Sequence, residues 1–436
     1  MALGGGTFTV QNRELPGAYL NFVSASAANT AFSERGIATM PLELDWGASN
    51  EIFEVTNEDF QKKSLELFGY EYTSEKMKGL HDLFLNARTL YGYRLNGAGK
   101  KAANQLAEAK YCGIRGNDIK IAVYVNEKDE TLFDVKTYLG TAVVDQQTVA
   151  TGDELKDNPY VVWKPQIALE ATAGTPLVGG ENGAVSSEDH QAYLDQAESY
   201  AFNVMGAAVT DGTTKSLYAA FNRRLRDEVG IKFQLVLHDY AKADYMGVIS
   251  VDNRTLDDGW NKAGLVYWVT GAAAGCAVNR SNQNKTYDGA FTVDTAYTQV
   301  QLKTAISEGK FVFHKAGNNV RVLEDINTMV TVSDAQGDIF KDNQTIRVID
   351  QIGNDIAVLF RTKYLGVVPN DAAGRISLWS DIVKHHEQLQ EMRAIEDFSD
   401  ADVTVERGDT KKSVVVTDLV TVVNAMSRLY MTVTVA

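Results

Sequence analysis

The sequence predicts an α/β protein with an inserted all-β domain, an α+β C-terminal domain and extended strand-forming arms at both ends. Three observations carry this prediction. Strand and helix patterns alternate from about residue 36, short β-rich segments interrupt them between residues 97 and 165, and two long helices lie near the C-terminus. At 436 residues, the chain is long enough for two to four domains, each with its own core.

The α/β domain is expected over residues 23–96 and 166–297. GIATMPLEL reads as a strand, and NEDFQKKSLELFG as a helix that begins at the N-cap Asn57 and ends at Gly69. A second helix, MKGLHDLFLNARTL, precedes the strand YGYRLN. Helix and strand patterns return later in HQAYLDQAESY, FNVMGAAVT, KSLYAAFNRRLRDEVG, FQLVLHDY and MGVISV. This alternation is typical of α/β domains.

Residues 97–165 are expected to form a small all-β domain inserted into the α/β domain. KAANQLAEAKY reads as a short helix at its start. The strands that follow are DIKIAVYVNE, LFDVKTYLG, TAVVDQQTV and YVVWKP, and acidic or glycine-containing turns separate them.

The C-terminal domain is expected over residues 298–427. It begins with the helix YTQVQLKTAISEGK and a hairpin around Gly317, and continues into the helices TIRVIDQIGNDIAVLFRTKYLG and RISLWSDIVKHHEQLQEMRAI. Strand patterns VTVERG and SVVVTDLVTVV follow. The domain therefore combines long helices with short strands.

Both ends of the chain have strand patterns, which predicts an N-terminal arm over residues 1–22 and a C-terminal arm over 428–436. In the C-terminal arm, Leu429, Met431, Val433 and Val435 alternate with Tyr430, Thr432 and Thr434. The N-terminal arm places Phe8 and Val10 before a Pro16-Gly17 break, and Tyr19 and Leu20 after it. Such arms either add strands to neighbouring subunits or pair within their own subunit.

Composition narrows the classes of function. The net charge of −15 opposes binding to a phosphate backbone, so nucleic-acid contact is not expected. No run of 18 apolar residues predicts membrane insertion, and the N-terminus lacks the pattern of a secretory signal. Cys112 and Cys276 are too few for a disulfide framework and are expected to be buried free thiols.

No motif for catalysis, metal binding or a cofactor stands out. The sequence has no GxSxG, HExxH, paired CxxC or GxxxxGK[ST] motif, and NGAGKKAA departs from the last of these at two positions. His238, Asp239 and Asp244 form a candidate hydrolase site, because these residues flank a strand end. GAAAGCA is expected to serve close helix packing, and His385-His386 is expected on a solvated helix face.

Several longer motifs resemble contractile tail sheath proteins of myovirus-type phages and phage-tail-like bacteriocins. AKYCGIRGNDIKIAV resembles the turn that enters the β-sandwich domain of sheath proteins. NNVRVLEDINT, TIRVIDQIGNDIAVLF, NDAAGRISLW and AIEDF resemble their C-terminal domain, and GGGTFTVQNRELPGAYLNF resembles the start of the subgroup from Gram-positive hosts. The resemblance covers essentially the whole chain.

This resemblance implies a structural subunit without enzyme activity, whose α/β domain has a subtilisin-like fold and no protease triad. Hexameric rings would stack helically around a tail tube protein, between baseplate and tail terminator proteins, and would contract to drive the tube through a cell envelope. The particle would assemble in the bacterial cytoplasm as a virion or tail-like particle. The long C-terminal helices would face the tube, with Lys384, His385, Glu387 and Arg393 as the candidate contacts. An α/β enzyme with an unrecognised site, or a non-contractile polymer such as a tube or surface-layer subunit, is the alternative.

Overall fold

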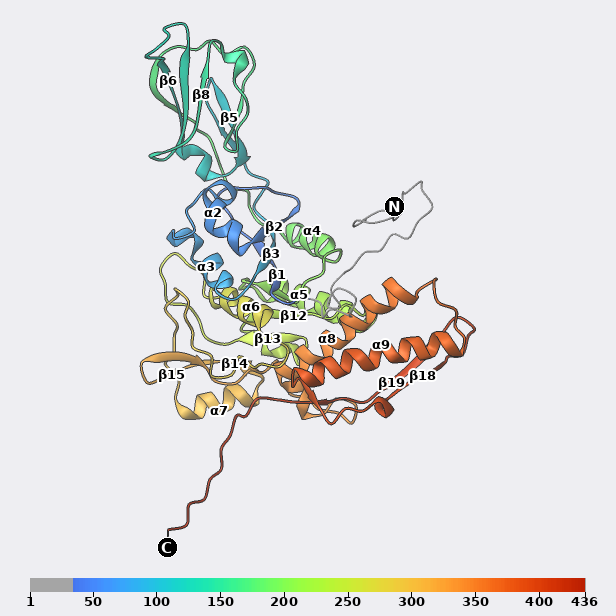
Figure 1. The fold of residues 1–436 in the computed structure, drawn as a ribbon. Coiled ribbons are helices and arrows are strands. Elements are labelled where there is room, and N and C mark those ends of the chain that lie inside the picture. The colour runs from blue at the N-terminus through green and yellow to red at the C-terminus, as the bar shows by residue number, and fades with distance from the viewer. Residues whose placement is uncertain (1–33, 436) are drawn as a thin grey trace, which may run out of the picture. The chain divides into compact units, whose positions relative to one another are not determined.

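The computed structural model describes residues 34–435, which divide into two compact units. One unit contains Arg35–Asp350 together with residues 424–435, and the other contains Gln351–Val423 (Figure 1). The predicted arm residues Phe8, Val10, Tyr19 and Leu20 lie outside the described residues.

A seven-stranded sheet forms the centre of the first unit. Its strands lie in the order β14-β13-β12-β11-β1-β3-β2, and all of them run parallel except β2, which is antiparallel to β3. The strands are β1 (Ile37–Leu42), β2 (Ile52–Thr56), β3 (Thr89–Arg94), β11 (Val204–Ala207), β12 (Gln234–His238), β13 (Val248–Val251) and β14 (Lys310–Phe311). The predicted α/β alternation is therefore confirmed for these elements.

Helices cover both faces of this sheet, which explains why its strands are almost continuously apolar. Along β12, Val236 packs into the core beneath α3 and α6, whereas Leu235 and Leu237 pack into the core beneath α4 and α5. The helices are α2 (Asn57–Phe68), α3 (Lys78–Phe84), α4 (Ser187–Ala197), α5 (Gly212–Arg224), α6 (Leu265–Gly275) and α7 (Gln299–Ser307), and a π-helical turn (Leu225–Val229) follows α5.

GAAAGCA packs closely against a neighbouring helix, as predicted. A Cβ atom on Gly271 would lie 2.2 Å from the carbonyl oxygen of Leu83, and one on Gly275 would lie 2.1 Å from that of Asn86. Helix α6 can therefore approach α3 only because these positions carry no side chain. Both cysteines are buried free thiols, as expected.

The inserted domain consists of two sheets packed around one core. Their strand orders are β10-β6-β7-β8 and β4-β5-β9. The strands are β4 (Lys101–Ala103), β5 (Ala107–Cys112), β6 (Ile119–Val125), β7 (Phe133–Leu139), β8 (Ala142–Val149), β9 (Val161–Trp163) and β10 (Thr172–Pro176). Because β10 pairs with β6, the inserted domain extends past residue 165, where the sequence placed its end.

The helix predicted for KAANQLAEAKY is wrong, because this segment forms β4 and β5. The Asn104 side chain accepts hydrogen bonds from the backbone N–H groups of Leu106 and Ala107 and so turns the chain between the two strands. Ala107 and Ala109 then alternate into the sandwich core. Tertiary pairing of β5 with β9 overrides the helix propensity of the alanine-rich sequence.

The rest of the first unit follows the predicted order of elements. The hairpin β15 (Phe313–Ala316) and β16 (Asn319–Val322) turns at Gly317, and helix α8 (Asn343–Leu359) begins further along the chain. The sequence placed the C-terminal domain from residue 298, but β14 at residues 310–311 pairs with β13 and so belongs to the central sheet. Short 3₁₀ turns occur at Glu75–Met77, Ile114–Asp118, Gly152–Glu154, Ala241–Ala243 and Asp338–Lys341.

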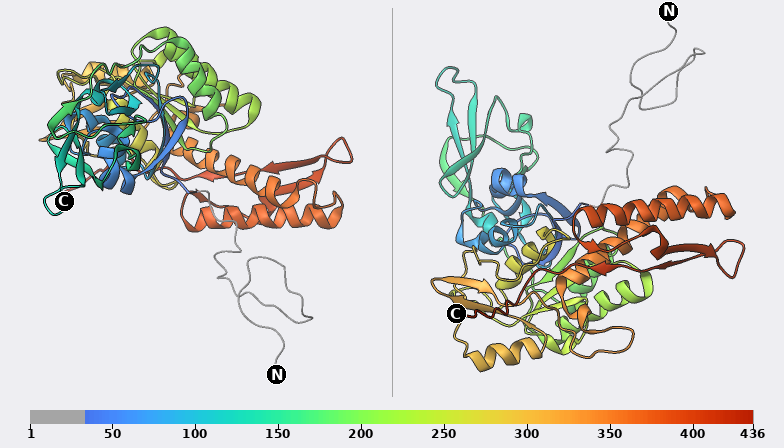
Figure 2. Two further views of the ribbon diagram at one scale, coloured as in Figure 1. Left: turned by 90° about the horizontal axis from the view of Figure 1, so that it is seen from above. Right: turned by 60° about the horizontal axis from the view of Figure 1, so that its bottom comes forward.

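The second unit contains the C-terminal part of α8, the long helix α9 (Ala372–Glu391) and two small antiparallel sheets. Helix α9 and the hairpin of β18 (Val403–Arg407) and β19 (Val414–Asp418) run side by side in both views of Figure 2, and α9 contacts β18. The second sheet pairs β17 (Ile395–Glu396) with β20 (Thr421–Val422). A π-helical turn (Phe360–Tyr364) and a 3₁₀ turn (Asp400–Asp402) complete the unit.

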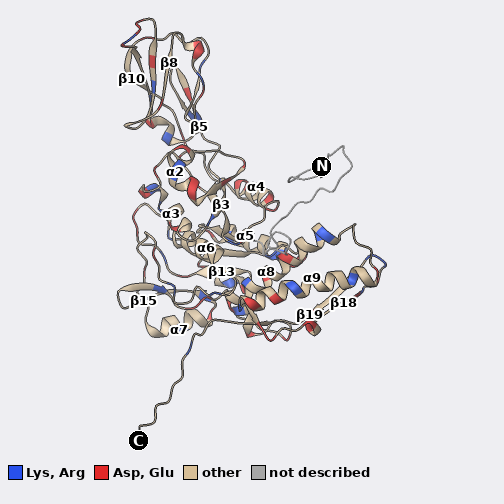
Figure 3. Cartoon of the chain, in the orientation of Figure 1, with Lys and Arg blue, Asp and Glu red and all other residues tan. Residues whose placement is uncertain are grey.

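Charge is spread over both units rather than gathered on one element. Figure 3 shows acidic and basic residues interspersed along α9, whereas the segment that leads to the C-terminus carries almost no charge. Among residues 34–435, no helix has the length and apolar character needed to cross a membrane.

Candidate assembly surfaces

The C-terminal segment leaves the first unit as an extended, exposed chain. Its start is held where the Ala425 N–H donates to Oε1 of Gln344, at 3.0 Å, and where Asn424 contacts the Thr345 hydroxyl. Beyond Arg428, which lies 3.9 Å from Glu324, no hydrogen bond or ion pair joins residues 429–435 to any described residue. The backbone donors and acceptors of these seven residues are therefore free to pair with another chain.

The apolar side chains of this segment are exposed to a degree that is unusual for their type. Leu429, Tyr430, Met431, Val433 and Val435 are 69–89% exposed. Thr432 and Thr434, between them, are exposed as well. An uncharged strand-forming segment of this kind is an aggregation hazard unless it has a partner.

The β18–β19 hairpin offers an unpaired strand edge. In the part of the chain that the structure describes, β19 pairs only with β18, from Val414 opposite Arg407 to Asp418 opposite Val403. Val415 and Val416 point to opposite faces of the strand, yet both are exposed, at 52% and 39%. A two-stranded hairpin gains stability when further strands are added.

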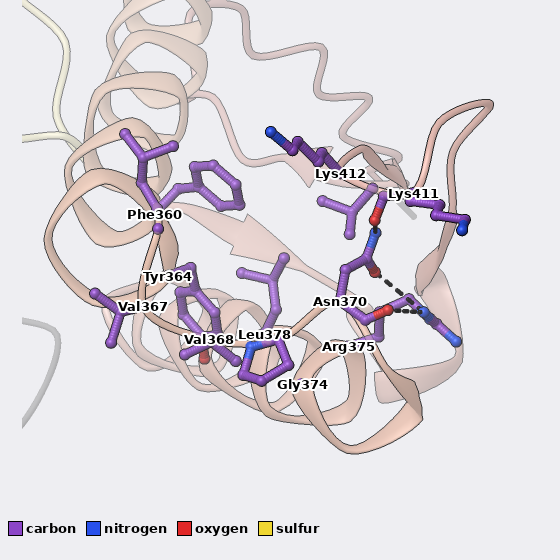
Figure 4. Close-up of a pocket in the computed structure, with 14 residues that line it drawn as sticks. Phe360, Tyr364, Val367, Val368, Asn370, Gly374, Arg375, Leu378, Lys411 and Lys412 are labelled. Carbon is purple, nitrogen blue, oxygen red and sulfur yellow. Dashed lines mark hydrogen bonds between the residues drawn. The ribbon is translucent and has the colours of Figure 1, made fainter.

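A cavity of about 500 Å³ lies at the end of this hairpin, against the turn between α8 and α9 (Figure 4). Apolar side chains from the π-helical turn after α8, the loop that follows it, α9 and β19 form its wall: Phe360, Tyr364, Val367, Val368, Leu378 and Val414. The Asn370 side chain links the loop before α9 to the hairpin by donating to the carbonyl oxygens of Lys411 and Ser413. Arg375 donates to Asn370 and completes a polar side of the cavity together with Lys411 and Lys412.

One of the four predicted tube contacts is contradicted by its burial. Lys384, Glu387 and Arg393 are exposed, but His385 is 1% exposed and cannot present its side chain to a partner in this conformation. Its neighbour His386 is also buried, so the expectation of a solvated histidine pair is wrong. The histidines occupy the inner side of α9, where hydrogen bonds satisfy their polar atoms.

These hydrogen bonds form a buried chain that links three elements of the second unit. Nδ1 of His385 lies 3.2 Å from Nδ1 of His386, Nε2 of His385 lies 3.0 Å from Oδ2 of Asp355, and Nε2 of His386 lies 2.8 Å from Oδ2 of Asp418. The chain therefore connects α9 to α8 and to β19. Because buried polar groups need partners, the pair is a structural link between the hairpin and the helices.

The structure does not bring the candidate hydrolase residues His238, Asp239 and Asp244 together into a catalytic site. The carboxylate of Asp244 instead accepts hydrogen bonds from the N–H groups of Val330 and Thr331 and from the hydroxyl of Thr331. Burial lowers the pKa of His238 below its usual value. No hydrogen bond joins His238, Asp239 and Asp244 to one another, and no cluster suited to a metal ion occurs among residues 34–435.

Sequence reasoning missed the β19 edge and the cavity. SVVVTDLVTVV was correctly interpreted as strand-forming, but three consecutive valines do not reveal that two of them are exposed on opposite faces. The cavity depends on residues about 50 positions apart in the chain, such as Phe360 and Lys412, and no local spacing marks such a site.

Comparison with known proteins agrees with this architecture of an α/β core, a β-sandwich insertion and a helical C-terminal unit. Four family models match consecutive parts of the chain: tail sheath protein Gp18 domain III N-terminal region (residues 35–95), phage tail sheath β-sandwich domain (96–182), phage tail sheath central domain (183–328) and phage tail sheath C-terminal domain (335–436). Together they define a class of structural tail proteins, which is not a class of enzymes. The chain belongs to the phage tail sheath protein family.

Individual relatives support this assignment. The phage-like element PBSX protein XkdK of Bacillus subtilis is 31% identical, and the match covers 98% of this chain and 99% of that protein. The crystal structure of a sheath tail protein from Desulfitobacterium hafniense is 35% identical, with a TM-score of 0.83 over 95% of this chain and 99% of that one. The contracted helical sheath of the anti-feeding prophage shares the fold, with a TM-score of 0.58 at 11% identity over 97% of this chain and 99% of that one.

Proposed function

We propose that this sheath subunit polymerises by exchanging strands with neighbouring copies, in six-subunit rings that stack helically around a tail tube. The observation that carries the proposal is the C-terminal segment, whose apolar residues alternate, are 69–89% exposed and have no partner among the described residues. Strand addition would supply main-chain hydrogen bonds and cover these side chains. The unpaired edge of β19 is the acceptor that fits such a strand.

Addition of the C-terminal segment to the β19 edge of a neighbour would let subunits join into a long polymer instead of a closed dimer. The donated segment and the accepting edge are different surfaces, so the contact is heterologous, and its repetition generates rings or helices. Seven extended residues span roughly 23 Å, enough to cross a boundary between subunits. The N-terminal residues Phe8, Val10, Tyr19 and Leu20 would form a second arm of the same kind.

The strand arms would keep the lattice connected while the subunits change their other contacts. Contraction between two arrangements of the rings would shorten the sheath and drive the tube through a cell envelope, with baseplate and tail terminator proteins at its ends. Such switching needs two alternative packings of the same subunits. The energy would be stored during assembly in the bacterial cytoplasm, so that no nucleotide or other cofactor takes part.

Electron microscopy of the purified chain in negative stain tests this function. We expect hollow cylinders with a helical lattice, either with the chain alone or after addition of the cognate tube. Cylinders that form but never shorten would favour a non-contractile polymer. Discrete small particles that persist after the tube is added would contradict the sheath function.

The tube-facing surface is proposed to include Lys384, Glu387 and Arg393 on and just after α9, without the buried His385. Alanine at these three positions is expected to leave self-assembly intact and to reduce tube decoration several-fold, because exposed charges set the specificity of an interface more than subunit stability. Cosedimentation with tubes measures this effect. The matched control replaces the exposed Lys62, Lys63 and Glu58 of α2. Equal decoration by both triple variants would contradict the assignment.

A further inference from the structure

A small cavity lies where the central sheet reverses the order of its strands. The chain places β3 on one side of β1, and later places β11 and β12 on the other side. Such a reversal leaves a crevice beyond the carboxyl ends of the strands, where open α/β sheets commonly bind ligands. Glu43 directly follows β1, Leu95 follows β3 and Ala208 follows β11, and all three line a cavity of about 220 Å³.

Two aromatic rings, from α6 and the loop before it, form another part of the cavity wall. Trp260 and Tyr267 line the cavity, and their ring centroids lie 6.4 Å apart in an edge-to-face arrangement. The ring of Trp260 also packs edge-to-face on Phe291, at 4.9 Å between centroids. The ring of Tyr267 lies against Gly79 of α3, where a Cβ atom would come within 2.9 Å of it. Packing therefore holds both rings in place.

The polar side chains of the cavity have no partner among the described residues. Glu43 forms no ion pair or hydrogen bond with another residue of 34–435, and the hydroxyl of Tyr267 forms no hydrogen bond with one. Burial raises the pKa of Tyr267 above its usual value, and the charge of Glu43 raises it further. The phenol therefore stays protonated at neutral pH, and its oxygen can accept a hydrogen bond from a ligand.

These groups favour a cation over an anion. The cavity lies at the start of α6, but the N–H groups of Ala263 and Gly264 already donate to Asn261 and so are not free to hold an anion. The carboxylate of Glu43 attracts a positive charge, and a tryptophan ring such as Trp260 is the aromatic surface that cations prefer. The volume lies below the range of about 300–1,000 Å³ that is typical of sites for drug-sized ligands, so the cavity suits a group of few atoms.

We propose that this cavity binds an alkylammonium group, with the ammonium at the carboxylate of Glu43 and the hydroxyl of Tyr267, and the aliphatic stem against Trp260. Two sources carry this group, a free small diamine and a lysine side chain of a partner protein. The proposal does not depend on the proposed strand exchange, because no residue of the cavity belongs to the C-terminal segment or to β19.

Equilibrium dialysis of the full chain with isotope-labelled 1,4-diaminobutane tests the proposal. We expect saturable binding at one site per chain, and Glu43→Gln is expected to weaken it at least about tenfold, because a charged hydrogen bond is lost. The matched control Glu71→Gln removes an exposed carboxylate that also has no ion pair among the described residues, and it should leave the affinity within about twofold of the wild type. Binding that does not saturate, or that both variants weaken equally, would overturn the proposal.

A second ligand distinguishes the two sources of the ammonium group. Tighter binding of Nα-acetyl-lysine-N-methylamide than of 1,4-diaminobutane assigns the site to a lysine side chain, and the reverse order assigns it to a free amine. Binding of neither ligand overturns the proposal. Photolabelling of the wild-type chain with a diazirine derivative of 1,4-diaminobutane covers the case in which Glu43→Gln fails to fold. Labels on residues 41–43, 208–209 or 259–267 support the site, whereas labels spread over other surfaces contradict it.

Discussion

Deleting residues 429–436 is expected to abolish self-assembly while leaving a folded monomer. The described part of this segment contributes no hydrogen bond and no buried side chain to its own subunit, so its loss removes nothing from either core. Assembly would lose several main-chain hydrogen bonds of about 1 kcal/mol each, which raises the critical concentration at least about a hundredfold. Circular dichroism measures the fold, and sedimentation over a series of concentrations measures assembly.

A point variant tests whether residues 429–436 act by adding a strand, because it keeps the segment but disrupts its strand pairing. Val433→Pro removes one backbone N–H and is poorly tolerated in an added strand, whereas Val433→Thr keeps a β-branched side chain. The proline variant should reproduce most of the deletion's effect, and the threonine variant should assemble nearly as the wild type does. Misfolding of the truncated chain would show instead that the strand belongs to its own core.

The central sheet could be predicted because burial on both faces leaves a local signal in the sequence. FQLVLHDY and MGVISV are short, apolar and bounded by polar residues, and both became parallel strands with helices on either side. The end of α2 at Gly69 was also predicted correctly. Gly69 has a φ of 75°, the left-handed conformation in which glycine commonly ends helices. The capping box that begins α2 is at Thr56, one residue before the predicted Asn57.

The elements that were missed depend on contacts between distant parts of the chain. KAANQLAEAKY has the composition of a helix and becomes two strands only because β9, about 50 residues later, pairs with β5. The burial of His385 and His386 depends on Asp355 and Asp418, which lie 30 and 32 residues away in sequence. Partners at such distances determine whether a polar residue faces solvent, and a single sequence does not reveal them.

Two buried ion pairs hold the first half of α8 within the first unit. Arg347 donates to Asp325 at 2.6 Å, and Arg226 donates to both carboxylate oxygens of Asp350 at 2.7 Å. The side chains of Arg347 and Asp325 are only 1% and 2% exposed. Breaking such a pair leaves an uncompensated buried charge, which costs far more than the loss of a surface pair.

Asp325→Ala is therefore expected to lower the free energy of unfolding of this unit by about 3–5 kcal/mol at pH 7. Urea unfolding followed by tryptophan fluorescence measures the change. Glu58→Ala removes the exposed pair with Lys62 and serves as the control, with an expected effect of at most about 0.5 kcal/mol. Asp325→Ala alone leaves the guanidinium of Arg347 buried without its ion-pair partner. The double variant Asp325→Ala/Arg347→Met should therefore lose less free energy of unfolding than Asp325→Ala alone. Additive losses would contradict the coupling.

The Asp325–Arg347 ion pair also predicts how the stability of the folded chain changes at low pH. Burial opposes ionisation of Asp325, but the Arg347 guanidinium and the N–H groups of Asn282 and Asn343 outweigh it and hold the pKa of this carboxyl below its usual value. A lowered pKa stabilises the folded state fully above the unfolded value of about 3.9, and this contribution is lost as the pH falls through the folded value. The wild-type chain should therefore lose more stability than Asp325→Ala between pH 5 and pH 2, and equal losses would contradict the role of this ion pair.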